Sequence, residues 1–181
     1  MKIIIASDIH GSKYSAEKLH QSFIKEGADK MVLLGDIYNH GPRNPFPRDY
    51  APMEVAKILN SIKDKILVIK GNCDSEVDQM ISEFAFVEQA QLLLDSGIVI
   101  TCTHGHKLNK DNLTSSVGDV LAYGHFHVNM MEKQNNGIWI INPGSCALPK
   151  ENSVAGYILI DGNKMYQKDL DGNIINQEII K

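Results

Sequence analysis

The stretch IIIASDIHG, residues 3–11, joins a short apolar run to two residues with ligand chemistry, Asp8 and His10. A continuous run of apolar residues suits a strand that is buried on both faces, as in a sheet covered by helices. Residues two apart on an extended chain point to the same side. This stretch therefore predicts a buried strand that ends at a binding site, where Asp8 and His10 offer two ligands to one pocket.

The same pattern recurs, because further apolar runs also end in polar residues. These runs cover residues 31–34, 66–69, 98–100 and 120–123. Helical periodicity over residues 15–26 and 52–62 separates the first three runs, which predicts a β-α-β-α-β start with right-handed parallel crossovers. In such a sheet, ligands bind outside the carboxyl ends of the strands. We therefore expect the polar residues to meet at one edge.

The C-terminal third has a different pattern, with tight-turn dipeptides between β-prone runs. These dipeptides are Asn136-Gly137, Asp161-Gly162 and Asp171-Gly172, and they predict antiparallel hairpins. We expect an α/β fold of two packed mixed β-sheets flanked by helices, a four-layer α-β-β-α sandwich, in a single domain over residues 1–181. The proline-rich segment 40–50 predicts a long loop, and such loops are often lids or contact loops.

The composition limits the classes of function. The 181 residues carry a formal net charge of -4, so we expect no stable nucleic-acid binding and no attraction to anionic membranes. Three widely spaced cysteines support neither a disulfide framework nor a zinc finger. The sequence shows no signal-peptide pattern and no apolar stretch of membrane length. We therefore expect a cytoplasmic protein with no membrane partner.

Polar patches after the predicted strands contain five of the seven histidines. The patches are Asp8-x-His10, Gly35-Asp36, Gly71-Asn72, Thr103-His104-Gly105-His106 and Gly124-His125-x-His127. Singly each patch is weak evidence, because Asp and Asn are common in turns and helix caps. Together, carboxylate, imidazole and amide ligands suit Mn²⁺, Fe²⁺, Zn²⁺ or Co²⁺. The ligands are too many for one ion with an open position, so we expect two ions that share a bridging carboxylate.

In order and spacing, these patches resemble the signature of the calcineurin-like metallophosphoesterases over the whole chain. Residues 39–44, 71–78 and 142–145 are further similar to a bacterial phosphodiesterase subgroup of that family. The resemblance implies two divalent metal ions, with Mn²⁺ as first choice and Ni²⁺, Fe²⁺, Co²⁺ or Zn²⁺ as alternatives. It also implies the ligands: Asp8, His10, Asp36 and His127 for the first ion, and Asp36, Asn72, His104 and His125 for the second.

The activity that the resemblance implies is hydrolysis of small phosphate diesters by a hydroxide that bridges the metals and attacks phosphorus. Catalytic contacts are expected from Asn72, Cys73, Asp74 and His106, although His106 can equally support a ligand. Cys73 stands where many relatives have histidine, and a thiol is a weaker hydrogen-bond partner than imidazolium. Cys73 is therefore expected to limit activity on poor leaving groups.

Two other functions stay open at this stage. A phosphomonoesterase or nucleotidase uses the same metals, and the choice of substrate depends on residues 39–51 and on the shape of the pocket. The eukaryotic retromer scaffold subunit has this fold but lacks the first histidine of the ligand set. A metal-binding scaffold is therefore the weaker alternative, because His10 is intact here. A homo-oligomer, dimer or tetramer, is not decided by the sequence.

Overall fold

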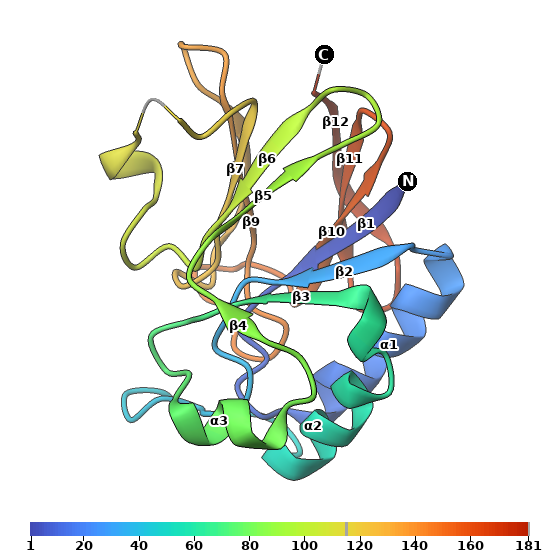
Figure 1. Cartoon of the computed structure of the whole chain (residues 1–181), viewed down its shortest axis with the longest axis vertical. Coiled ribbons are helices and arrows are strands. Elements are labelled where there is room, and N and C mark those ends of the chain that lie inside the picture. Colours follow the sequence, from blue (N-terminus) through green and yellow to red (C-terminus); the bar gives the residue numbers. More distant parts are fainter. Residues whose placement is uncertain (115, 181) are drawn as a thin grey trace.

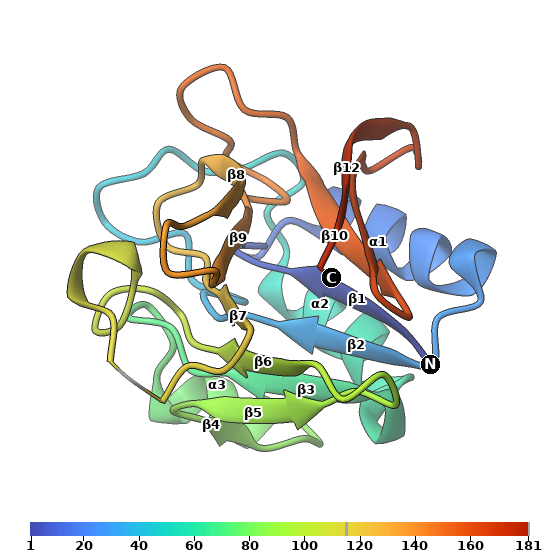
Figure 2. The ribbon, with the colours of Figure 1, turned by 90° about the horizontal axis from the view of Figure 1, so that it is seen from above.

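The computed structural model describes residues 1–114 and 116–180, which form two mixed β-sheets (Figures 1 and 2). The first sheet has the order β12-β11-β10-β1-β2-β3-β4, and the second has the order β5-β6-β7-β9-β8. The first consists of β1 (Lys2–Ala6), β2 (Lys30–Leu33), β3 (Ile66–Ile69), β4 (Phe86–Val87), β10 (Gly156–Asp161), β11 (Lys164–Asp169) and β12 (Ile174–Ile179). The second consists of β5 (Ala90–Leu93), β6 (Val99–Cys102), β7 (Val120–Ala122), β8 (Asn129–Lys133) and β9 (Trp139–Pro143). The single domain over residues 1–181 stays a prediction, since Ser115 and Lys181 lie outside the described residues.

Strand direction follows the two halves of the sequence. Strands β1 to β4 pair in parallel, whereas β10, β11 and β12 extend the sheet from β1 as antiparallel strands. The expected β-α-β-α-β start is confirmed, with α1 (Lys13–Glu26) after β1 and α2 (Pro52–Asn60) between β2 and β3. In the second sheet β6, β7 and β9 are parallel, and β5 and β8 are antiparallel edge strands. The three predicted hairpins are present at their turn dipeptides.

Alternate residues of β1 enter two different cores. Ile3 and Ile5 pack in the cluster between the two sheets, where they meet residues of the second sheet such as Ile100. Ile4 and Ala6 pack in the other cluster, against the apolar face of the helices. Successive side chains of a strand point to opposite faces, so a run that is apolar at every position is buried on both sides.

The outer layers differ between the two sheets. Helices α1 and α2 lie side by side on the first sheet, and α3 (Glu76–Ile81) follows β3 (Figure 1). On the second sheet the outer cluster contains Val117 and Tyr123, with Leu108 and Leu113 packed against it. The regular element described in that segment is a single 3-10 turn, Lys110–Asn112. The two-sheet sandwich is confirmed, and its fourth layer is a loop segment where the sequence favoured helices.

The proline-rich loop is tied to the first strand end by backbone and side-chain hydrogen bonds. Ala51 N donates to Gly11 O at 2.8 Å, and Lys13 N donates to the carbonyl of Asp49 at 3.0 Å. Ser12 caps α1 by accepting from Ser15 N at 3.2 Å, and its hydroxyl donates to the carbonyl of Arg48 at 2.7 Å. One serine thus starts the helix and fixes the end of the loop.

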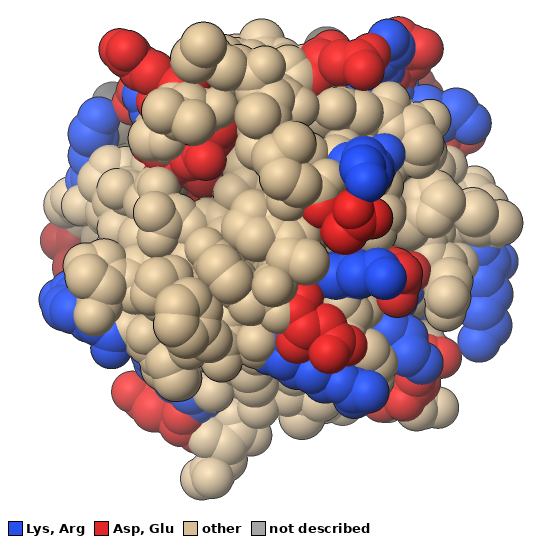
Figure 3. Space-filling view, turned by 90° about the horizontal axis from the view of Figure 1, so that it is seen from below, with Lys and Arg blue, Asp and Glu red and all other residues tan. Residues whose placement is uncertain are grey.

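Charges of both signs are interleaved on the face of the molecule shown in Figure 3, in agreement with the small net charge of -4. Among the described residues, every helix is too short or too polar to span a bilayer.

Replacement of Ser12 by alanine tests this double role. We expect Ser12→Ala to lower the free energy of unfolding by about 1 kcal/mol, the usual cost of losing an N-cap side chain. Urea denaturation followed by circular dichroism measures the change. Ser61→Ala, at an exposed serine after α2, is the matched control and should stay within about 0.5 kcal/mol of wild type. Equal stability of Ser12→Ala and wild type would contradict the capping role.

Candidate functional site

Five strands deliver the predicted ligands to one edge of the molecule. Asp8 and His10 follow β1, Asp36 follows β2, and Asn72 follows β3. The second sheet contributes His104 after β6, and His125 and His127 after β7. The strands run in parallel within each sheet, so their carboxyl ends meet at the same edge. The structure therefore brings together every metal ligand that the sequence predicted.

The first group of ligand atoms surrounds Asp8. Its Oδ1 lies 3.1 Å from His127 Nε2 and 3.5 Å from His10 Nε2. The two imidazole nitrogens are 3.1 Å apart, and Asp36 Oδ2 is 3.9 Å from His10 Nε2. These side chains are almost fully buried. Four ligand atoms therefore face one small volume.

The second group surrounds His104. Its Nε2 lies 3.0 Å from Asn72 Oδ1, 3.2 Å from His125 Nδ1 and 3.5 Å from Asp36 Oδ2. The other oxygen of Asp36 accepts a hydrogen bond from the backbone N–H of Cys73 at 2.8 Å. That bond turns Asp36 Oδ2 toward both groups, which is the geometry required of a bridging carboxylate.

Three imidazoles are oriented by backbone carbonyls. The Nδ1 atoms of His10, His104 and His127 lie 2.7, 2.6 and 2.7 Å from the carbonyl oxygens of residues 39, 34 and 148, respectively. When Nδ1 donates its proton, the lone pair of a neutral imidazole is on Nε2. All three lone pairs then point into the ligand groups. This arrangement is typical of metal-binding histidines.

Five of the predicted ligands have unusual backbone conformations. Asp8, His10, Asp36, His125 and His127 have φ between 51° and 66°, in the left-handed region that costs non-glycine residues roughly 1–2 kcal/mol each. Backbone strain of this kind clusters at functional sites. Two glycines allow the close packing behind the ligands: a Cβ on Gly71 would lie 2.2 Å from Asp36 Oδ1, and one on Gly124 would lie 2.7 Å from Asp8 Oδ2.

The electrostatics of the site favour a cation. Burial raises the pKa of Asp8, but the imidazoles of His10 and His127 outweigh it and hold this pKa well below its ordinary range. Burial likewise raises the pKa of Asp36, and His104 reverses the shift. In return, although burial lowers the pKa of His104, the carboxylates of Asp36 and Asp8 raise it to about 9. Both carboxylates are therefore anionic at neutral pH.

The residues fit divalent metal ions. Asp8 Oδ1 is buried and has no hydrogen-bond partner among the described residues, and the Nε2 atoms of His10 and His127 lie 3.1 Å apart. Ligand atoms that each lie about 2.1 Å from one ion are separated by roughly 3.0–3.5 Å. A cation in each group would satisfy these atoms, and carboxylate, imidazole and amide ligands suit Mn²⁺ or Zn²⁺.

Asp74 has a different place from the one expected. Its carboxylate accepts hydrogen bonds from the backbone N–H groups of Asp36, Ile37 and Gly71 at 2.7–2.8 Å. Asp74 is buried behind the ligands and does not line the cavity in front of them. It joins the turns that carry Asp36 and Asn72, so its contacts are those of a positioning residue.

Cys73 and His106 lie at the rim of the ligand groups. Cys73 lines the cavity, and burial followed by the charge of Asp36 raises the pKa of its thiol to about 12. The thiol is therefore protonated at neutral pH and can donate a weak hydrogen bond. His106 is exposed, with its ring centroid 5.3 Å from that of His104 and 6.1 Å from that of His125.

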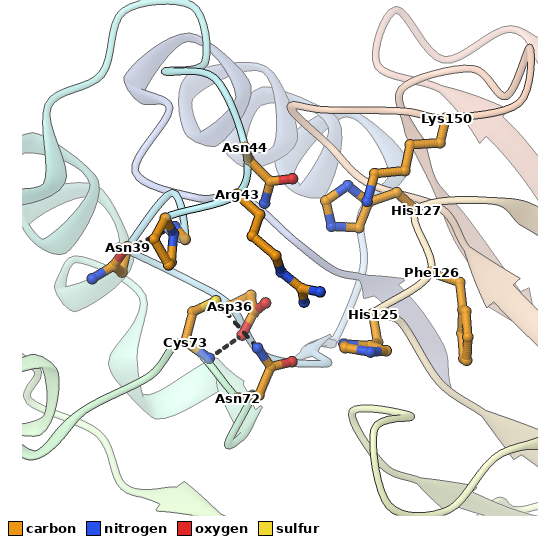
Figure 4. Close-up of a pocket in the computed structure, with 12 residues that line it drawn as sticks. Asp36, Asn39, Arg43, Asn44, Asn72, Cys73, His125, Phe126, His127 and Lys150 are labelled. Carbon is orange, nitrogen blue, oxygen red and sulfur yellow. Dashed lines mark hydrogen bonds between the residues drawn. The ribbon is translucent and has the colours of Figure 1, made fainter.

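An open cavity of about 750 Å³ lies in front of the ligands and is called the central cavity here. Its walls include Arg43 and Asn44 of the proline-rich loop, and Phe126 and Lys150 on the opposite side (Figure 4). Arg43 extends toward His125 and Asp36 in Figure 4. The sequence pattern did not predict Lys150 and Phe126 as residues of the site. The position of Phe126 between two predicted ligands was a signal, whereas Lys150 lies in an irregular segment without any pattern.

The segment 142–145 holds the strand ends in place. Ser145 Oγ donates to the carbonyl of Asp8 at 2.7 Å and accepts from the N–H of Leu148 at 2.9 Å. Leu148 in turn provides the carbonyl for His127. Asn142 Nδ2 donates to the carbonyl of Gly124 at 2.9 Å. This segment therefore positions ligands from both sheets without contacting the ligand groups itself.

Comparison with known proteins finds a matching family and relatives that are named phosphodiesterases. The family model of the calcineurin-like phosphoesterase superfamily domain matches residues 1–165. Phosphodiesterase YfcE of Escherichia coli (strain K12) is 43% identical over 164 residues, which are 90% of this chain and 89% of that protein. Phosphodiesterase MJ0936 of Methanocaldococcus jannaschii is 24% identical over 81% of this chain and 84% of that protein. A solved structure of YfcE, described as a phosphoesterase from E. coli, has 40% identity, covers 100% of both chains and gives a TM-score of 0.95.

The role of Asp74 is tested by Asp74→Asn. An amide replaces an acceptor oxygen with an NH₂ group that faces backbone N–H groups, so buried donors lose their partner. We expect a loss of about 1–3 kcal/mol in the free energy of unfolding, measured by urea denaturation of metal-free protein. Asp29→Asn removes the charge from an exposed aspartate that accepts from Lys2 N, and should change stability by about 0.5 kcal/mol or less. Equal effects of the two variants would refute the positioning role.

Proposed function

This chain belongs to the calcineurin-like phosphoesterase superfamily, and we propose that it is a metal-dependent phosphodiesterase that hydrolyses small phosphate diesters. The observation that carries the proposal is the pair of candidate ligand groups that share Asp36 Oδ2 at the floor of the central cavity. The relative from E. coli, which is 43% identical, is named a phosphodiesterase, and this similarity favours diesters over monoesters.

The proposed cofactor is two divalent ions, with Mn²⁺ as the first candidate. The first ion would be held by Asp8, His10, Asp36 and His127, and the second by Asp36, Asn72, His104 and His125. Two bound ions would activate a water molecule at neutral pH and neutralise the charge of the phosphate oxygens. A mixed oxygen and nitrogen ligand set suits Mn²⁺, but also Fe²⁺, Co²⁺, Ni²⁺ and Zn²⁺.

Residues around the ligands would bind and orient the diester. The guanidinium of Arg43 and the ammonium of Lys150 line the central cavity from opposite sides, so both can attract the anionic phosphate. Asn72 can donate to a phosphate oxygen through its NH₂ group while its oxygen faces the second ligand group. Cys73 offers a weak donor on the same wall, and His106 completes the rim.

The surroundings of the site support a substrate smaller than a nucleic acid. Arg43 and Lys150 are two cations beside the cavity, and the net charge of the chain is -4. Phosphate-backbone binding requires several basic residues on one face. We therefore propose that the substrate is a small diester and that the protein does not bind nucleic acid stably. We also propose a cytoplasmic location. Dimeric and tetrameric states are both compatible with this proposal.

Hydrolysis of bis(p-nitrophenyl) phosphate and of p-nitrophenyl phosphate tests the function directly. Metal-stripped protein should be inactive, and Mn²⁺, added back in a series with Ni²⁺, Zn²⁺ and Mg²⁺, should restore activity that favours the diester. A preference for the monoester would favour a phosphomonoesterase. Tight metal binding without turnover on either compound would favour a metal-binding scaffold.

Asp36→Ala tests the bridging ligand. Because Asp36 Oδ2 faces both ligand groups, its loss should abolish binding of both ions and lower kcat by at least about 10³-fold, within the range that metal activation of water provides. Metal content after gel filtration and diester hydrolysis are the two measurements. Asp64→Ala, at an exposed aspartate, is the control and should retain both. Full metal occupancy in Asp36→Ala would contradict the assignment.

A further inference from the structure

A second cavity adjoins the central cavity and shares one wall with it. It measures about 190 Å³ and is called the side cavity here. Tyr123, Phe126, Val128 and Met130 provide apolar walls. Phe126 lines both cavities, so its side chain borders the two.

The ring of Phe126 is held in position but is not covered. Its centroid lies 5.1 Å from that of His125 and 5.9 Å from that of Tyr123, and both pairs are edge-to-face. The backbone is constrained as well, because Phe126 N donates to Gly124 O at 2.7 Å. Despite these contacts, 44% of the residue remains exposed. Phe126 therefore offers a fixed aromatic surface next to a proposed metal ligand.

Size and polarity of the side cavity fit one aromatic ring. An apolar cavity of roughly 150 Å³ is known to accept benzene, and this one measures about 190 Å³. Aromatic walls pair well with a planar ring through stacked or edge-to-face contacts. The charged residues at the cavity are Lys110, Asp111 and Glu151, a net negative set that disfavours the phosphate group itself. The anion therefore belongs in the central cavity and an uncharged ring belongs in the side cavity.

We infer that the side cavity is a subsite for an aromatic ester group of the diester, either an aryl group or a pyrimidine base, and that Phe126 determines this preference. The inference rests on the proposed function, because it takes the phosphate to lie in the central cavity. One ester group occupies the side cavity while the other leaves toward solvent. Diesters with two alkyl groups leave the side cavity unfilled and bind less well.

Diesters that share one leaving group test the subsite. The substrates are p-nitrophenyl phenyl phosphate, p-nitrophenyl methyl phosphate and the p-nitrophenyl ester of thymidine 5′-phosphate, assayed with the ion that restores activity. Each releases p-nitrophenolate, so differences in kcat/KM reflect the other ester group. Intrinsic reactivities cancel when the phenyl-to-methyl ratio of a variant is divided by that of wild type. The thymidine ester shows whether a base on a sugar spacer or a directly attached ring fits better.

Phe126→Ala is expected to lower the phenyl-to-methyl ratio roughly tenfold, the effect of removing one stacking ring, mainly through KM. Phe126→Tyr should restore most of the ratio because the ring is kept. Met130→Trp fills the side cavity from β8 and should lower the ratio as well. Phe46→Ala removes an exposed ring from the proline-rich loop and should leave the ratio unchanged. A general disturbance of the metal ligands would slow all substrates alike and would leave the phenyl-to-methyl ratio unchanged. An unchanged phenyl-to-methyl ratio in Phe126→Ala would therefore overturn the inference.

A binding experiment separates this inference from the proposed function. Diphenyl phosphate and dimethyl phosphate are titrated into Zn²⁺-loaded protein with ¹³C-labelled methionine methyl groups, and NMR follows Met130. A shift of the Met130 signal with the diphenyl compound alone supports the subsite, even if no diester is hydrolysed and the proposed activity fails. No shift with either compound, in a protein that hydrolyses diesters, would refute the subsite and leave the activity standing.

Discussion

The close approach of two buried carboxylates is the constraint on which the rest of this structure depends. The ion-pair contacts of Asp8 and Asp36 among the described residues are with histidines, not with Lys or Arg. Removing a charged group from water costs several kcal/mol unless it is compensated. Protonated imidazole can compensate in part, since the pKa of His104 is raised to about 9. Divalent cations would add positive charge beside both carboxylates and would also coordinate Asp8 Oδ1, which has no hydrogen-bond partner among the described residues.

Strain in the backbone adds to this cost. Five proposed ligands have positive φ, and at the lower limit of roughly 1 kcal/mol each the sum is of the order of the net stability of a domain, about 5–15 kcal/mol. The fold offsets the strain with buried hydrogen bonds behind the ligands. Asp74 joins the turns after β2 and β3, and Ser145 joins β1 to the segment after β9. These buried hydrogen bonds thus hold the site residues in a backbone conformation that an isolated loop would not keep.

The parts of the fold that are set by local pattern could be predicted from the sequence. The apolar run 3–6, the helical periodicity of 15–26 and the Asn-Gly and Asp-Gly turns correspond to β1, α1 and three hairpins. Strands β4 and β5 could not be predicted in this way, because β4 has two residues and β5 alternates between half-buried and exposed positions. The outer layer of the second sheet was also missed, since Leu108, Leu113 and Val117 pack in one cluster with Tyr123 from a segment without helical periodicity.

The predicted site shows the same division. The predicted ligands lie at fixed spacings directly after strands, and the parallel arrangement of those strands decides that these side chains meet, so a linear pattern was sufficient to predict their meeting. A catalytic contact was expected of Asp74 from the family resemblance, but position in the sequence does not fix side-chain direction, and its carboxylate turns toward three backbone N–H groups. The cavity walls are harder still to predict from the sequence, because Arg43, Phe126 and Lys150 come from three separate loops. The chemistry of the site therefore follows from local sequence, whereas its selectivity depends on how distant loops close around it.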